Sequence, residues 1–341
     1  MQLKTMSTAA VPRSTPPGPA VSVVVPTCGR PGLLDRCLAA LLRQSMPASA
    51  YEIIVVDDRP GPATRQLVES RFDPNNAHGV PVRYIANLGR HGPAAARNLG
   101  WRAARAAIVA FTDDDTVPAH DWLEHGLGAF TEQVAAVSGR IHMPLPPSPT
   151  DYERNAQDLE QSEFVTANCF CRKRVLERLD GFDERFTLAW REDSDLHFRL
   201  LRSGAQLAHA PQALVVHPVR PAPWGVSLRQ VPKIAFDALL YKKHPRLYRE
   251  KIRARPRWDY YLTVACLLLA LLGLGAGELP LFAGFGMAWL ALSARFCAAR
   301  LRGTARTLPH VAEMVVTSAL IPPLAVFWRF AGALRYRVCF T

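Results

Sequence analysis

The sequence lacks a cysteine framework. Its seven cysteines are scattered, and no second pair stands at zinc-site spacing from the C-x-C pair Cys169 and Cys171. We therefore expect reduced thiols in a cytosolic domain. Residues 1–19 also lack the apolar core of a signal peptide and contain four prolines. This composition predicts a disordered lead-in.

Acidic residues are scarce relative to basic ones. The 341 residues include 41 lysines and arginines against 29 acids, which gives a formal net charge of +12. Such an excess suits an anionic partner, either a nucleic acid, a nucleotide diphosphate or a membrane face. Most of it lies after residue 228, beside long apolar segments. Membrane lipids are therefore the simpler partner, and we expect no nucleic acid.

Residues 20–220 alternate strand-like and helix-like patterns. Short β-branched runs indicate buried strands, and apolar residues at helical spacing indicate amphipathic helices. We expect strands at 21–25, 51–56, 82–86, 108–112, 134–142, 164–171 and 214–217, and helices at 30–44, 62–71, 93–106, 121–131, 172–179 and 191–203. This order predicts an α/β, Rossmann-like and mostly parallel sheet, which binds ligands at the carboxyl ends of its strands.

The composition changes near residue 220. Residues 221–257 are basic and partly amphipathic, which predicts a juxtamembrane region ahead of a membrane region at 258–341. No charged residue interrupts 260–277 or 279–294, and arginines flank the pair. The pattern predicts a transmembrane hairpin at about 260–296 with both ends in the cytosol, although a buried helical pair is the alternative.

A third apolar segment covers about 308–328. Glu313 and the pair Pro322 and Pro323 interrupt it, and arginines follow it. These features favour a re-entrant or interfacial segment over a third crossing.

Three consecutive acids, Asp113, Asp114 and Asp115, follow the fourth predicted strand. Side chains at i and i+2 of an extended segment point the same way, so Asp113 and Asp115 can face one cation. Carboxylates suit Mg²⁺ or Mn²⁺, which also bind phosphate oxygens. The alternative is an acidic turn that caps the next helix, but three carboxylates would repel one another there without a cation.

Other polar residues allow two interpretations each. Asp57 and Asp58 end a strand and either bind a nucleotide or cap a turn. Arg97 lies on a helix opened by glycines and proline, which either holds phosphate or is an ordinary surface helix. His217, at the end of the last strand, is either a metal ligand or structural.

The stretch from Arg191 to Asp195 opens a helix with three acids. It either supplies a general base or places acids favourably at a helix N-terminus. Trp190 and the preceding 181–186 loop look shaped to meet a ligand.

Taken in order, six segments resemble the family-2-type glycosyltransferases with a GT-A fold, and the resemblance covers about residues 20–220. These segments are VSVVVPTCGRPGLLDRCLAALLRQ, YEIIVVDDRP, NLGRHGPAAARNLGW, VAFTDDDTVP, ANCFCRKRVLERLDGFDERF and REDSDLHFRLLRSG.

The resemblance implies an inverting enzyme that uses a nucleotide-sugar donor. It implies Asp193 as the general base that takes the proton of the acceptor hydroxyl. The implied nucleotide-sugar-binding residues are Pro26, Thr27, Arg30, Asp57, Asp58, Arg97, Asp113 and Asp114. The implied metal ligands are Asp113, Asp115 and His217, and the acceptor-side residues are Asn168, Trp190 and Glu192.

Two departures from the family pattern matter. Arg59 and Pro60 replace the usual Gly-Ser after the paired aspartates, and no Q-x-x-R-W follows the base motif. The second departure favours one sugar per event over a long polymer. We therefore expect transfer to a glycan or lipid-linked acceptor at the cytosolic face of the cell inner membrane, in cell-surface glycan or glycolipid synthesis.

Two other functions remain open. A metal-dependent nucleotidyltransferase would also use paired carboxylates, although residues 26–32 make a poor glycine-rich phosphate loop. The second possible function is a catalytically inactive membrane-anchored scaffold. The presence of Asp113, Asp115 and Asp193 argues against it.

Overall fold

A computed structural model describes residues 18–71 and 79–340. The predicted lead-in therefore lies outside the described residues, apart from its last two. The strands are β1 (Val21–Thr27), β2 (Tyr51–Asp57), β3 (Val82–Ala86), β4 (Ile108–Phe111), β5 (Val117–Pro118), β6 (Val134–His142), β7 (Cys169–Arg172) and β8 (Gln206–Val216).

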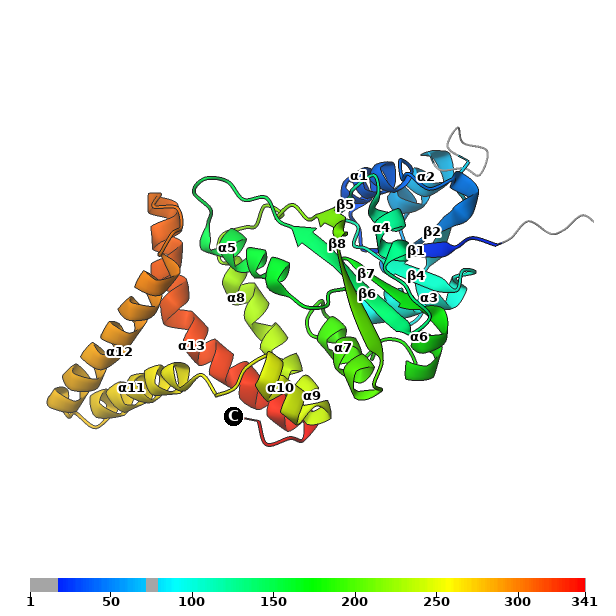
Figure 1. The fold of residues 1–341 in the computed structure, drawn as a ribbon. Helices are drawn as coiled ribbons and strands as arrows, with labels where there is room; N and C mark the ends of the chain where they lie inside the picture. Colours follow the sequence, from blue (N-terminus) through cyan, green and yellow to red (C-terminus); the bar gives the residue numbers. More distant parts are fainter. Residues whose placement is uncertain (1–17, 72–78, 341) are drawn as a thin grey trace, which may run out of the picture.

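Helices surround these strands and continue beyond them (Figure 1). Those of the first two thirds of the chain are α1 (Pro31–Leu41), η1 (Ala48–Ala50), α2 (Pro62–Arg71), α3 (Pro93–Ala103), α4 (Trp122–Gly128), α5 (Asp151–Gln157), η2 (Asp158–Gln161), α6 (Lys173–Leu179) and α7 (Glu192–Arg202). Those that follow are α8 (Val226–Gln230), η3 (Val231–Ile234), α9 (Ala235–Lys243), α10 (Pro245–Lys251), α11 (Trp258–Gly275), α12 (Leu279–Arg300) and α13 (Leu308–Tyr336).

The strands form one sheet in the order β3-β2-β1-β4-β7-β6-β8-β5. The first four positions are parallel, as expected from the alternation of strands and helices. β7 then runs antiparallel to both β4 and β6, and β5 runs antiparallel to β8. The sheet is therefore mixed, with its parallel half built from the N-terminal part of the chain.

Both faces of the sheet are covered, which explains its nearly continuous apolar strands. In β1, Val23 and Val25 lie in a core cluster with side chains of α1, α2 and α4. Val24 points to the opposite face, into a cluster with α3, α6 and α7. The alternation follows from the two-residue period of a strand. This packing fixes the ends of β1, β2 and β4 side by side.

Two predicted strand boundaries were wrong. The expected strand at 164–171 is only Cys169–Arg172, because a turn that Asn168 closes onto Val165 precedes it. The last strand is much longer than 214–217 and starts at Gln206. Its register against β6 shifts between Ala210 and Leu214, and this irregularity contains a proline, which interrupts the strand pattern in the sequence. The helix α5 was not predicted.

α11, α12 and α13 are long and apolar enough to cross a membrane, by length and composition. α11 and α12 form a hairpin that projects away from the sheet (Figure 1). Large apolar side chains are exposed along it, including Leu272 and Met287. A predicted pair of apolar helices is thus confirmed.

The third segment forms a single helix that Pro322 and Pro323 do not break, while its predicted re-entrant or interfacial position stays a prediction. α13 continues through both prolines for 29 residues. It packs against η3 and α9 as well as against the hairpin. Gly332 allows the closest approach, since a Cβ there would lie 2.6 Å from the backbone oxygen of Ala235. Tertiary packing therefore holds the helix together despite the two missing amide donors.

Candidate active site

The candidate site begins where β1, β2 and β4 end together. The amide of Asp58 donates to the carbonyl of Thr27 at 2.8 Å. The hydroxyl of Thr27 donates to Asp114 Oδ2 at 2.7 Å, and Arg30 pairs with the same carboxylate at 2.7 Å. Burial raises the pKa of Asp114 to about 6, against the opposing effect of Arg30. Asp114 is fully buried and ties the acidic loop to the end of β1.

Asp113 and Asp115 come together without the predicted extended segment, since Asp114 and Asp115 lie in a turn. Together with His217, each offers a ligand atom, and these atoms lie within 4.8 Å of one another. The backbone amide of His217 donates to the carbonyl of His142, which holds His217 beside the end of β6. His217 Nδ1 is buried and has no hydrogen-bond partner.

This donor set fits a divalent cation. Two carboxylates and an imidazole are suitable ligands for Mn²⁺, and the His217 imidazole, whose Nδ1 has no hydrogen-bond partner, lies 3.6 Å from Asp115 Oδ1 through its Nε2. Arg220, which the sequence did not single out, pairs with Asp115 at 3.0 Å. The two carboxylates therefore lie among cationic groups even without an ion.

Arg97 connects this group to the predicted base. Its side chain is buried, with 3% exposed, and its Nη2 lies 2.7 Å from Asp113 Oδ1. Its Nη1 lies 3.1 Å from Glu192 Oε1. Of the two interpretations of Arg97, the ordinary surface arginine is wrong, because the guanidinium is inside the site.

Glu192 and Asp193 open α7 at this point. Burial, and then the neighbouring Asp193, raise the pKa of Glu192 to about 7. Burial also raises the pKa of Asp193, whose Oδ1 accepts a hydrogen bond of 2.6 Å from the amide of Ser194. Glu192 is held by Arg97, whereas Asp193 is the less buried of the two. Asp193 is therefore the better placed to accept a proton from a ligand.

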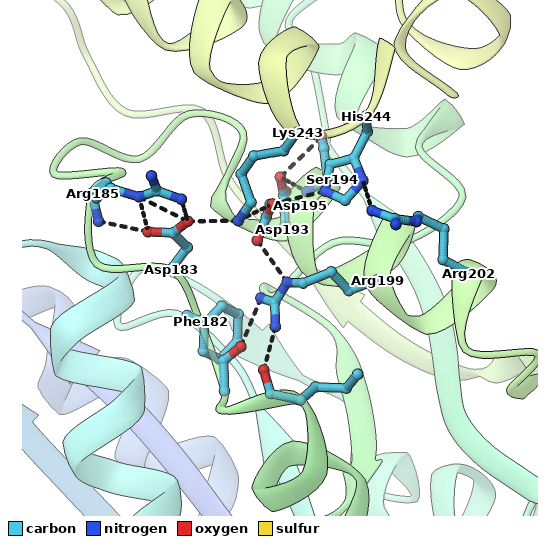
Figure 2. A network of polar contacts seen from close by, with 12 residues as sticks. Phe182, Asp183, Arg185, Asp193, Ser194, Asp195, Arg199, Arg202, Lys243 and His244 are labelled. Atoms are coloured by element: carbon cyan, nitrogen blue, oxygen red, sulfur yellow. Dashed lines mark hydrogen bonds and ion pairs between the residues drawn. The ribbon is translucent and has the colours of Figure 1, made fainter. Parts of the chain in front are cut away.

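A buried network fixes the other side of α7 (Figure 2). Asp195 is fully buried and receives Lys243 at 2.5 Å and His244 Nε2 at 3.0 Å on Oδ1. Its Oδ2 accepts a hydrogen bond of 2.8 Å from Arg199. Lys243 also pairs with Asp183 at 2.5 Å, so the loop before α7 is held by the same ammonium group. A shift of α7 would separate these pairs and leave a buried charge without a partner, which is strongly destabilising. The network therefore holds α7 in one orientation.

Asp57 and Asp58 hold the loop that opens α3. Asp58 accepts from Asn87 at 2.7 Å and from the amide of Gly92 at 2.9 Å. Gly92 has a φ of 119°, and a Cβ there would lie 2.8 Å from the carbonyl of Thr187. Asp57 is buried and accepts from Tyr84 at 3.1 Å. These contacts show a structural role, while the predicted contacts to a nucleotide stay a prediction.

The three acceptor-side residues separate in the structure. Trp190 is 37% exposed and donates to Asp237 at 3.0 Å, beside Glu192. Asn168 is fully buried, and its amide bonds Trp122 and the carbonyls of Arg140 and Ala213. The described polar contacts of Asn168 are thus internal, to the sheet and to α4. Pro26 is likewise buried within β1.

Comparisons with known proteins match the chain to glycosyltransferases. The model of "Glycosyl transferase family 2" matches residues 22–179, and that of "Glycosyl transferase family group 2" matches residues 108–331. The chain is 28% identical to the glycosyltransferase AglE of Haloferax volcanii over 218 residues, which are 60% of this chain and 68% of the relative. It is 35% identical to the pre-mycofactocin glycosyltransferase of Mycobacterium tuberculosis over 230 residues, which are 62% of this chain but 46% of that relative.

A solved structure shares the fold. The mannosyltransferase PcManGT of Pyrobaculum calidifontis, in complex with GDP-Man and Mn²⁺, aligns with a TM-score of 0.55 at 22% identity, covering 94% of this chain and 88% of that one. The likeness establishes the GT-A fold. Because the second family model matches more than half of the chain, the protein belongs to the family-2 glycosyltransferases.

Proposed function

We propose that the chain transfers a sugar from a nucleoside-diphosphate donor to an acceptor hydroxyl at a membrane face, with inversion and with Mg²⁺ or Mn²⁺. One observation carries the proposal. The group of Asp113, Asp115 and His217 is joined through buried Arg97 to the Glu192–Asp193 pair. The proposed cation site would thus lie beside a carboxylate that can take a proton.

Asp113, Asp115 and His217 would hold the cation. When bound, such a cation stabilises the negative charge that develops on a leaving diphosphate. PcManGT was solved with GDP-Man and Mn²⁺, which supports this pairing of donor and metal in the shared fold. Thr27, Arg30 and the loop that Asp58 orders would contact the nucleotide, at the strand ends where such sheets bind ligands.

Asp193 would act on the acceptor. The acceptor oxygen forms a bond to the anomeric carbon, the bond from that carbon to the diphosphate breaks, and the hydroxyl proton goes to Asp193. Arg97 holds Glu192 at 3.1 Å, so the guanidinium limits repulsion between the neighbouring carboxylates. A single displacement of this kind inverts the anomeric configuration.

The three apolar helices support a reaction at a membrane. We propose that the catalytic domain lies on the cytoplasmic side of the inner membrane, because arginines flank the hairpin. A glycan or lipid-linked acceptor at that face suits the attachment of α13 to the catalytic domain.

The function is tested with the full chain in detergent, Mn²⁺ and a panel of UDP-, GDP- and TDP-sugars. Release of nucleoside diphosphate supports sugar transfer. Release of pyrophosphate from a nucleoside triphosphate, without turnover of any sugar nucleotide, would support the nucleotidyltransferase instead. An Asp115→Asn variant is the matched control, because it keeps the size of a proposed metal ligand and removes its charge.

A further inference from the structure

Lys233 carries an unpaired charge next to the candidate site. It lies on η3, and its side chain is half-buried. In the part of the chain that the structure describes, no carboxylate lies within ion-pair distance of its ammonium group. Burial lowers the pKa of Lys233, although the nearby Glu192 opposes that effect. A half-buried ammonium without a counter-ion is costly, so it indicates a site for an anion.

The surroundings of Lys233 place it on the acceptor side. Its Nζ lies 6.0 Å from the centre of the Trp190 ring, in cation–π range. Trp190 itself is fixed by Asp237, which also receives Arg191 at 2.7 Å. Arg220 is close enough to act on the pKa of Lys233. The ammonium thus lies within cation–π range of Trp190, and the charges of Glu192 and Arg220 act on its pKa.

η3 also links this position to the membrane helices. It packs directly against α13, whose Leu320 and Phe327 are exposed apolar side chains. An anion bound at Lys233 would therefore lie between the candidate site and a lipid-facing helix. The other nearby cations are engaged, since Arg220 pairs with Asp115 and Arg97 with Asp113 and Glu192.

We propose that Lys233 binds the phosphate of an acceptor whose hydroxyl-bearing head group is joined to a lipid through a phosphate ester. The inference rests on the proposed function and specifies its acceptor class. The lipid chain lies toward α13, the phosphate meets Lys233 beside Trp190, and the hydroxyl reaches Asp193. The donor diphosphate would bind at the cation held by Asp113 and Asp115.

Direct binding tests the proposal without knowledge of the true acceptor. The full chain, in maltoside detergent that contains no phosphate, is titrated with dodecyl phosphate, dodecanol and inorganic phosphate. We expect dodecyl phosphate to bind more tightly than the other two. Lys233→Gln should weaken its binding by about tenfold or more, as expected for a lost charge-assisted hydrogen bond. Lys233→Arg should retain most of the affinity.

Two controls distinguish recognition at Lys233 from general charge attraction and from donor binding. Arg246→Gln removes an equal charge from the same basic segment, at a side chain that is 90% exposed, and should leave binding unchanged. Mn²⁺-dependent binding of GDP or UDP should be equal in the wild type and Lys233→Gln. Loss of that binding would assign Lys233 to the donor and overturn the proposal.

Other results would also overturn it. Equal affinity for dodecanol and dodecyl phosphate would exclude phosphate recognition, and equal affinity for inorganic phosphate would exclude a lipid-linked source. Failure of the proposed function is distinguishable, because it would show as an absence of nucleoside diphosphate release while the Lys233-dependent binding of dodecyl phosphate persists.

Discussion

The guanidinium of Arg97 donates a hydrogen bond of 2.7 Å to the carboxylate of Asp113. The same side chain reaches Glu192 at 3.1 Å, so one buried cation joins the proposed metal group to the proposed base pair. The position of the proposed metal group relative to the Glu192–Asp193 pair therefore depends on Arg97.

Arg97→Gln should therefore destabilise the fold as well as reduce activity. The variant leaves buried carboxylates unpaired, which costs about 3 kcal/mol. Thermal unfolding of the detergent-solubilised chain measures the loss. Arg102→Gln, on the same helix but with 48% of its side chain exposed, should cost under about 1 kcal/mol. Equal unfolding midpoints for the two variants would contradict the bridging role.

Asp193→Asn should stop turnover and spare donor binding. The amide keeps the oxygen that accepts the Ser194 amide, but it cannot take a proton at neutral pH. We expect the rate to fall by about 10²- to 10⁴-fold, with Mn²⁺-dependent nucleotide affinity unchanged. Asp180→Asn, at a fully surface-exposed carboxylate, is the control. Full activity in Asp193→Asn would remove the base assignment.

The pH dependence should reveal the buried pair. Burial raises the pKa of Asp193 above its usual value, and the base must be unprotonated to act. The rate should therefore fall as the pH drops through that raised pKa, at a higher pH than a free aspartate would give. The acidic limb of the pH–rate profile reports apparent pKa values of the Glu192–Asp193 pair rather than of one residue.

Glu192→Gln should leave this acidic limb nearly in place. The charge of Asp193 helps to raise the pKa of Glu192 to about 7, so Glu192 is already protonated at the lower pH where Asp193 titrates. A rate profile from pH 4 to 8 measures the position of the limb. A limb displaced by a full pH unit or more would show that Glu192 is still charged when Asp193 titrates.

The parallel half of the fold was accessible from the sequence because its strands are buried on both faces. Runs such as Val21–Thr27 carry their own signal, and the acidic triplet marks the end of β4. The sequence gives less information about the strands in the other half of the sheet. β8 was mostly missed because exposed residues and Pro211 interrupt its alternation.

The candidate site likewise contains residues that the sequence reveals and residues that it does not. Asp113, Asp115 and Asp193 belong to contiguous acidic motifs that sequence reasoning can find. Arg220 and Lys233 are single basic residues in a basic region, and only tertiary packing places them beside Asp115 and Trp190. For Lys243 and His244 the signal is also tertiary, since their partner Asp195 lies almost fifty residues earlier.

Polar substitutions on the hairpin should weaken membrane attachment. Leu268, Leu272, Met287 and Leu290 are each more than half exposed on α11 and α12. Transfer of each such side chain into lipid contributes about 1.5–3 kcal/mol, so changing all four to glutamine should sharply reduce flotation with lipid vesicles.

Substitution tests the hairpin better than deletion of 258–341, because α13 packs against α9 and its loss would uncover the catalytic domain. Leu88→Gln, at an exposed leucine before α3, is the control and should float normally. Undiminished flotation of the fourfold variant would contradict the anchor.

The central claim is that Asp113 and Asp115 hold a cation that in turn holds the donor diphosphate. Calorimetric titration of the full chain with GDP, UDP and TDP, in Mn²⁺ and then in a chelator, tests it most directly. We predict that at least one nucleotide binds only with Mn²⁺, and that Asp115→Asn loses this binding. Equal nucleotide affinity in the chelator, or in Asp115→Asn, would contradict the account.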